Sequence, residues 1–363
     1  MMKKYKVIQI GTGNTGMHAL RGIIEHPDLE LVGLWVHSDQ KAGRDAGELC
    51  GLDHVGVTAT QDIKALIAMD ADCVCYMKAI ALGNPTKPGS YGERCIDEEC
   101  AFLESGKNVV GTTDASLIYP YIWGPEFVER IEKSCQKGGS SFLWSGIEPG
   151  FMCDVLPLVM SSLSHRIDSI RGQEVLCYAA YKEPVTLSGM GFGSPLPDEA
   201  TRKKWSRGIA MGTASSIQMI ADALGVKLDE IRGTWEGETL KEDIEVAIGK
   251  VEAGMVGAVR YEGVGIVGGK PLISVEHVNR LQDDLAPNWA QLRPGGYRVI
   301  IEGKPSMKIE VAFTKGDPCI EACVATSARA VNSIPVICDS PPGVYTFLNL
   351  PRPVMGVHRM KVV

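Results

Sequence analysis

The chain has 363 residues, of which 45 % are hydrophobic and 22 % charged, and its formal net charge at pH 7 is −7. This length predicts about two domains, and the apolar fraction excludes general disorder. The acidic balance argues against a nucleic-acid partner, and no apolar run is long enough to predict a membrane span. The N-terminal residues lack the pattern of a signal peptide. The 11 cysteines are scattered without zinc-ligand spacing, so we expect reduced thiols in a cytoplasmic protein and no metal site.

The first half of the chain alternates short apolar strands with helical segments. The pattern predicts strands over 6–10, 29–36, 71–76, 108–110 and 141–144, and helices over 17–24, 61–68, 95–105 and 127–136. Strand, helix, strand at this spacing is typical of a doubly wound parallel sheet.

Strand-like runs dominate from about residue 150 onward. They cover 170–178, 240–252, 258–267, 272–278, 297–301 and 308–312, with helical segments over 156–163 and 213–224. The alternation predicts an α+β domain with an open, largely antiparallel sheet. A helix over 318–331 and a loop-rich tail follow, and we expect the tail to return to the first domain. The predicted domains are therefore 1–147 with 318–363, and 148–317.

The first strand runs directly into a glycine-rich turn that opens the first helix. The turn reads GxGxxG, as Gly11-Thr12-Gly13-Asn14-Thr15-Gly16. In this context the first glycine permits a tight turn, the second admits a pyrophosphate and the third lets the helix pack on the strand. The turn therefore predicts a dinucleotide site, and the alternative is a purely structural turn in a nucleotide-free domain.

The end of the second strand distinguishes NADP from NAD. A 2′-phosphate favours hydroxyl and cationic partners, whereas a free ribose favours a carboxylate. Ser38, Lys41 and Arg44 favour NADP, and Asp39 leaves NAD possible. Both basic residues also suit a solvated loop.

Taken together, these motifs resemble the dihydrodipicolinate reductase-like superfamily, and within it the 2,4-diaminopentanoate dehydrogenase and native amine dehydrogenase branch. The likeness is carried by 6–16, 26–33, 43–47, 106–110, 148–151, 276–277 and 328–335, and so spans nearly the whole chain. It implies an N-terminal Rossmann domain, a substrate-binding second domain and a homodimer built through the open sheet. It also implies reversible reductive amination of a small carbonyl compound with ammonia and NAD(P)H.

Two positions depart from the pattern of that branch. Its glutamate in the loop after the strand at 108–110 falls on Ala115 or Ser116 here, and the nearest carboxylate is Asp114. Its Asn-Pro-Gly-Phe turn begins with Glu148 here. Either a carboxylate has moved across the pocket, or the enzyme is an alcohol dehydrogenase or ketone reductase of the same fold. A cofactor-binding sensor without catalysis is the third alternative.

Four residues are the candidate catalytic groups. Asp114 follows a strand at the edge where open α/β sheets bind ligands, although an aspartate there also caps turns. Glu148 lies in a turn at the predicted domain boundary, where a carboxylate is suited to proton transfer. His277 matches a pocket histidine of the amine dehydrogenases, and Tyr181 lies near a pocket position of that family. The segment 189–193, with three glycines, is a candidate lid or an ordinary loop.

Overall fold

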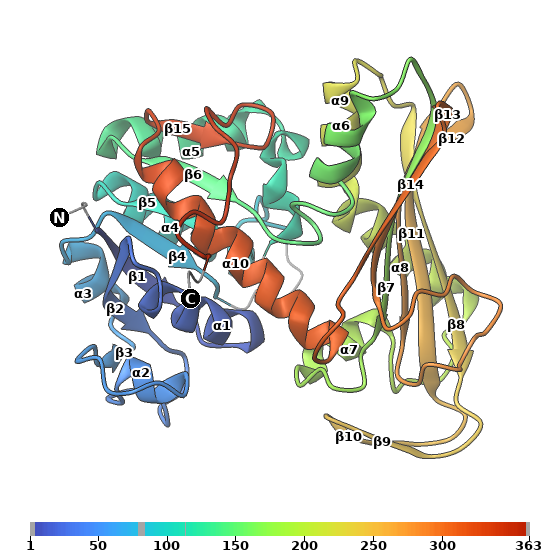
Figure 1. Cartoon of the computed structure of the whole chain (residues 1–363), viewed down its shortest axis with the longest axis horizontal. Helices are drawn as coiled ribbons and strands as arrows, with labels where there is room; N and C mark the ends of the chain where they lie inside the picture. The colour runs from blue at the N-terminus through green and yellow to red at the C-terminus, as the bar shows by residue number, and fades with distance from the viewer. Residues whose placement is uncertain (1–3, 79–83, 113, 361–363) are drawn as a thin grey trace. The chain divides into compact units, whose positions relative to one another are not determined.

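The computed structural model describes residues 4–78, 84–112 and 114–360. The first three residues, on which the signal-peptide prediction partly depends, and Thr113 in the Asp114 loop lie outside the described ranges. The chain divides into two compact units, which Figure 1 shows in colours that follow the sequence. Unit 1 holds Met1–Gly146 and Cys323–Val363, and unit 2 holds Ile147–Ala322.

Unit 1 is built on a seven-stranded sheet whose neighbouring strands all run parallel. Its order is β15-β6-β5-β4-β1-β2-β3. The strands are β1 (Tyr5–Ile10), β2 (Leu29–Trp35), β3 (Ala59–Thr60), β4 (Cys73–Tyr76), β5 (Asn108–Gly111), β6 (Ser141–Trp144) and β15 (Gly343–Tyr345). The predicted doubly wound parallel sheet is confirmed, and the tail adds its edge strand β15.

Helices connect these strands and complete the core of unit 1. They are α1 (Asn14–Ile24), α2 (Ala46–Leu49), α3 (Ile63–Ala68), α4 (Tyr91–Glu104), α5 (Pro125–Gly138) and α10 (Pro318–Cys338), with short 3₁₀ turns η1 (Ala115–Ile118) and η2 (Pro120–Trp123). In α1 the buried residues Gly16, Ala19, Leu20 and Ile23 follow helical spacing, which is why this segment folds onto the sheet. Within the described residues, no helix is long and apolar enough to cross a membrane.

Unit 2 is built on a six-stranded mixed sheet of order β14-β13-β7-β12-β11-β8. The strands are β7 (Arg166–Cys177), β8 (Glu230–Thr239), β11 (Val256–Val267), β12 (Lys270–Arg280), β13 (Gly296–Lys304) and β14 (Met307–Ala312). Strand β12 pairs parallel with β7 and the other pairs are antiparallel, as the sequence predicts for the most part. The helices are α6 (Val155–Ser161), α7 (Pro184–Met190), α8 (Glu199–Gly212) and α9 (Ala214–Ala223).

The sequence prediction is wrong for one strand of unit 2. The expected strand over 240–252 is a small hairpin, β9 (Ile244–Val246) with β10 (Gly249–Val251), and the sheet strand β8 lies before it. Strand β8 escapes the pattern because glycine stands where an apolar residue would signal the covered face. A Cβ atom on Gly233 would lie 2.0 Å from the Ser206 carbonyl oxygen of α8, so the helix requires glycine there.

Candidate active site

The glycine-rich turn joins β1 to α1 in unit 1. Gly11 has a φ of +92°, and a Cβ atom there would lie 2.5 Å from the Met77 carbonyl oxygen. A Cβ atom on Gly16 would lie 2.5 Å from the Gly11 carbonyl oxygen. Gly13, the N-cap of α1, differs, because no described atom lies within 4 Å of a Cβ added there. Two glycines are therefore required by close packing and one faces open space.

This turn fits the pyrophosphate of a dinucleotide. The N–H groups in the first turn of a helix have no partner within the helix, and the helix dipole attracts anions to them. At the start of α1 these groups belong to Asn14, Thr15 and Gly16. The open space at Gly13 lets a phosphate approach the backbone, which a side chain would prevent.

The residues predicted to contact a 2′-phosphate follow β2. Lys41 lies against the glycine turn, since its Nζ donates to the Thr12 carbonyl oxygen at 2.9 Å and to Thr12 Oγ1 at 3.1 Å. Ser38 Oγ accepts from the Gln40 backbone N–H, and Arg44 is exposed. Asp39 accepts a hydrogen bond from Gln61 Nε2 at 3.0 Å. The fold thus brings a lysine from 29 positions away to the candidate phosphate site.

Asp114 lies in unit 1, three residues after the end of β5. Its Oδ1 accepts from the backbone N–H of Ser116 at 2.9 Å and from Ser116 Oγ at 2.6 Å, so it caps the turn η1. Burial raises the pKa of Asp114, and the bonds from Ser116 oppose that rise. The capping role that the sequence left open is therefore present, and it occupies one oxygen of the carboxylate.

His277 lies between two carboxylates in unit 2. Its Nε2 is 3.4 Å from Glu148 Oε1, and its Nδ1 is 3.1 Å from Glu174 Oε1. The side chains are 12 %, 3 % and 5 % exposed for His277, Glu148 and Glu174 respectively, so the three groups interact in a largely water-free environment. Two of the predicted catalytic residues, Glu148 and His277, are thus brought together.

Opposite charges set the protonation of this cluster. Burial alone would lower the pKa of His277, but the charges and hydrogen bonds of Glu174 and Glu148 prevail and raise it to about 10. The pKa of Glu174 is lowered even though burial opposes this, because His277 and two tyrosine hydroxyls stabilise its anion. His277 is therefore an imidazolium at neutral pH, paired with the Glu174 carboxylate.

The two carboxylates differ in how they are held. Glu174 accepts three hydrogen bonds, from His277, from the Tyr178 hydroxyl at 2.9 Å and from the Tyr297 hydroxyl at 3.1 Å. Glu148 Oε2 is buried and has no hydrogen-bond partner among the residues that the structure describes. Glu174 is thus fixed by its surroundings, whereas Glu148 keeps one oxygen available.

A further buried carboxylate, Asp154, lies near Glu148 and supports the turn that carries it. Asp154 accepts from the backbone N–H of Gly150 at 2.8 Å and from Ser216 Oγ at 2.9 Å. Burial and the charge of Glu148 raise the pKa of Asp154 to about 6. The Asp154 carboxylate therefore holds the backbone that follows Glu148 in place.

Aromatic rings surround the histidine cluster within unit 2. The Tyr261 ring stacks on His277 with centroids 4.5 Å apart and an interplanar angle of 13°. Tyr178 contacts Tyr181 edge-on at 5.4 Å and stacks with Phe192 at 6.3 Å. Tyr181 therefore reaches the cluster through Tyr178, which itself donates to Glu174. Phe192 is 3 % exposed, so the candidate lid segment is packed against this wall.

Sequence reasoning missed Glu174, which organises the cluster. It stands in a strand between Gln173 and Val175, and its register partner on β12 is His277. A charged residue on the same strand face as predicted core residues is the signal that could have found it. Pairing it with His277 required the register of β7 with β12, which the sequence does not give.

Comparison with known protein families gives two matches. Residues 151–362 match the 2,4-diaminopentanoate dehydrogenase C-terminal domain. Residues 5–80, which include the glycine turn, match the N-terminus of dihydrodipicolinate reductase. The two matches together cover most of both units.

Individual relatives agree with these matches over nearly the full chain. The chain is 36 % identical over 355 residues to an amine dehydrogenase of Streptomyces virginiae, covering 95 % of this chain and 96 % of that protein. It is 26 % identical over 371 aligned positions to the 2,4-diaminopentanoate dehydrogenase of Acetoanaerobium sticklandii, covering 99 % and 97 %. The structure of an amine dehydrogenase from Mycobacterium smegmatis superposes with a TM-score of 0.76 at 19 % identity, covering 96 % of each chain.

Proposed function

The chain belongs to the family of 2,4-diaminopentanoate and amine dehydrogenases, and from that premise we propose that it catalyses the reversible reductive amination of a small ketone or aldehyde with ammonia. It is an NAD(P)-dependent dehydrogenase, and unit 1 is its NAD(P)-binding Rossmann-type domain. We assign cofactor binding to residues 1–147 with 318–363, and substrate binding to 148–317.

One observation supports amine chemistry most directly, namely that His277 lies between the buried carboxylates of Glu148 and Glu174. Glu174 and the imidazolium of His277 balance each other's charge, so the cluster carries one net negative charge in the state in which Glu148 has released its proton. A buried negative charge favours a cationic iminium or ammonium over a neutral ketone, because little water screens the attraction.

The bound cofactor supplies hydride chemistry at the substrate carbon. Glu148 holds or releases a proton at Oε2, the oxygen that keeps no partner among the described residues. His277 exchanges a proton with Glu148 through Nε2, which returns Glu148 to its starting state, while Nδ1 of His277 stays bound to Glu174. Tyr181 positions the aromatic wall through its contact with Tyr178. Asp114 is the alternative acid/base group, but its cap on η1 opposes that role.

A specific observation also supports the second candidate, an alcohol dehydrogenase or ketone reductase of the same fold. The glutamate that the amine dehydrogenase branch carries after β5 is replaced by Ala115 or Ser116. A carbonyl oxygen requires only a proton donor, and the protonated His277 supplies one without any ammonia site.

Ammonia dependence distinguishes the two candidates. NADPH oxidation is measured with a panel of small ketones and aldehydes, each with and without ammonium at saturating concentration. We expect turnover to require ammonium, and the amine product to reduce NADP in the reverse direction. Equal turnover without ammonium, with an alcohol as product, would instead establish carbonyl reduction.

For the cofactor we propose a preference for NADP, with NAD as the alternative. Lys41 already lies against Thr12 of the glycine turn, and Ser38 lies in the same loop. Arg44 follows Lys41 closely in the sequence and is exposed to solvent. We assign it as the second cation for a 2′-phosphate. The measurement is the ratio of kcat/KM for NADPH and NADH.

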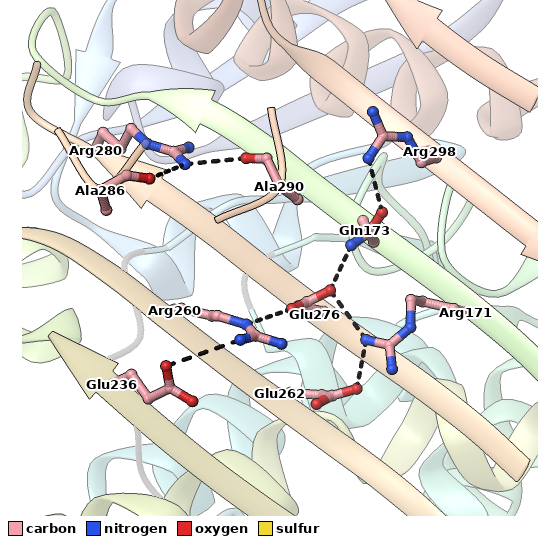
Figure 2. A network of polar contacts seen from close by, with 10 residues as sticks. All are labelled: Arg171, Gln173, Glu236, Arg260, Glu262, Glu276, Arg280, Ala286, Ala290 and Arg298. Atoms are coloured by element: carbon pink, nitrogen blue, oxygen red, sulfur yellow. Dashed lines mark hydrogen bonds and ion pairs between the residues drawn. The ribbon is translucent and has the colours of Figure 1, made fainter. Parts of the chain in front are cut away.

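We also propose a homodimer formed through one face of the unit 2 sheet, as the family resemblance implies. Figure 2 shows a polar network on this face. At its centre Glu276 accepts from Gln173 at 2.5 Å, Arg260 at 2.6 Å and Arg171 at 3.0 Å. These balanced charges suit a self-complementary surface. The molar mass of Arg260→Glu, measured by light scattering, tests this dimer. A symmetric interface contains the substitution once in each protomer, so the two reversed charges should yield monomers.

A further inference from the structure

Asn279 lies on β12, two residues after His277, and is completely buried. Neither its Oδ1 nor its Nδ2 has a hydrogen-bond partner among the residues that the structure describes. A buried amide with both of its polar atoms unpaired costs free energy, so a native protein keeps one where something else completes its bonds. The feature therefore indicates a place for a polar group that the described residues do not supply.

The strand register explains why no side chain on the neighbouring strands pairs with this amide. Asn279 is opposite Val259 on β11 and Leu176 on β7, and both neighbours are apolar. Because side chains alternate along a strand, Asn279 shares its face with His277, about 6.6 Å away along β12. His277 in turn is opposite Tyr261 and Glu174. The unpaired amide thus lies on the face that carries the candidate proton-transfer groups.

We propose that Asn279 is a specificity-determining residue that binds a second, uncharged polar group of the substrate, a hydroxyl on the chain that carries the reacting carbonyl. This proposal rests on the function proposed above and names the substrate class of the same site. The amide oxygen accepts the hydroxyl proton while the amide N–H₂ donates to the hydroxyl oxygen, so one hydroxyl satisfies both atoms.

The charges on this face select a neutral group. At the register levels of Val275, His277 and Asn279, the residues that share this face on β7, β11, β12 and β13 are Gly172, Glu174, Leu176, Val259, Tyr261, Gly263, Val275, His277, Asn279, Tyr297 and Val299. None of them is lysine or arginine, and His277 is already bound by two carboxylates. A carboxylate or phosphate on the substrate would therefore be buried without a counter-ion, which is costly.

The test compares 4-hydroxy-2-butanone with 2-pentanone, which has the same chain shape but a methyl group in place of the hydroxyl. We expect the native enzyme to prefer the hydroxyketone about 10- to 100-fold in kcat/KM, because the analogue leaves the amide unpaired. In Asn279→Leu, which keeps the size but removes both polar atoms, the preference should disappear or reverse. Its melting temperature should equal or exceed that of the native protein.

Ser274→Ala is the matched control, since Ser274 is a buried polar residue on the opposite face of the same strand and should leave the preference unchanged. If Asn279→Leu does not fold, Asn279→Val provides the same comparison. A native ratio near one, or the same ratio in the native protein and the variant, would overturn the proposal. The ammonium dependence of each reaction is recorded separately, so a failure of amine chemistry is distinguishable from a failure of the Asn279 assignment.

Discussion

His277 and Glu174 fix each other's protonation state, with Nδ1 of the imidazole 3.1 Å from Oε1 of the carboxylate. The hydroxyls of Tyr178 and Tyr297 hold the Glu174 carboxylate in place. The contact of Glu174 with Nδ1 of His277 then directs Nε2 of the same ring toward Glu148. A donor hydrogen bond at one ring nitrogen orients the other for chemistry. Glu174 is therefore a positioning residue for the proposed reaction.

Replacing Glu174 by glutamine should remove the charge that keeps His277 protonated. We expect the pKa of His277 to fall and kcat to drop about 100-fold, the usual scale of a general acid–base contribution. The pH dependence of kcat/KM should shift its alkaline limit to lower pH. Tyr297→Phe removes one hydrogen bond to the same carboxylate without changing charge and should shift the profile much less. An unshifted profile in Glu174→Gln would contradict the positioning role.

The raised pKa of His277 also predicts how stability depends on pH. An unfolded histidine has a pKa of about 6.5, whereas in the folded protein the pKa of His277 is about 10. The ion pair therefore stabilises the fold fully below about pH 6.5 and loses this contribution as the pH rises to 10. Chemical denaturation between pH 6 and 10 should show a decline in the free energy of unfolding. In His277→Gln that decline should be smaller, and equal slopes would refute the pairing.

Neutralising each candidate carboxylate in turn should separate their roles. Glu148→Gln should lower kcat about 100-fold or more, because Glu148 keeps an available oxygen beside His277. The same change should leave the Kd of NADPH unchanged. Asp114→Asn keeps an oxygen that can cap η1, so we expect a much smaller loss of kcat. Steady-state kinetics and a fluorescence titration of NADPH measure both quantities. The reverse order of effects would move the acid/base role to Asp114.

Alanine at two glycines should distinguish folding from cofactor binding. Gly11→Ala should lower the free energy of unfolding by about 1–3 kcal/mol, since the new Cβ atom meets the Met77 carbonyl oxygen at a positive φ. Gly13→Ala meets no described atom, so its melting temperature should be close to the native value. It should nevertheless weaken NADPH binding, because the methyl group occupies the phosphate approach. Native affinity in Gly13→Ala would exclude this turn as the pyrophosphate site.

Removing the amine of Lys41 tests the cofactor preference. Lys41→Ala should raise the KM for NADPH about tenfold, which corresponds to about 1.4 kcal/mol for one charge-assisted hydrogen bond. The KM for NADH should change little, since NADH has no 2′-phosphate. Lys64→Ala on α3 removes an exposed lysine of the same unit and serves as the control. An unchanged ratio of the two KM values in Lys41→Ala would discard Lys41 as a phosphate ligand.

The sequence predicted those features whose signal is local. The glycine turn between β1 and α1 and the alternation of strands and helices in unit 1 both depend on short patterns, whereas the edge strand β15 lies in the tail that the sequence predicted as loop-rich. Strand β8 was missed because Gly233 removes the apolar signal where α8 packs closely.

The site was predicted less completely than the fold, for a related reason. Glu148 and His277 stood out through the family resemblance, but Glu174 and Asn279 lie within strands that otherwise look like core. Their roles depend on which residues face them on neighbouring strands, and pairing register is a long-range property. Lys41 illustrates the same limit, since its contact with Thr12 joins two loops 29 positions apart.

The chain order of unit 1 has a consequence for how the protein is made. Its core includes Ala330, Val331, Ile334 and Ile337 of α10, and its sheet ends with β15, so both belong to the last 41 residues of the unit, Cys323–Val363. During translation all of Ile147–Ala322 is synthesised before these residues. The N-terminal segment must then wait with apolar surface exposed, a state that invites chaperone binding or aggregation. The domain synthesised first is the one completed last.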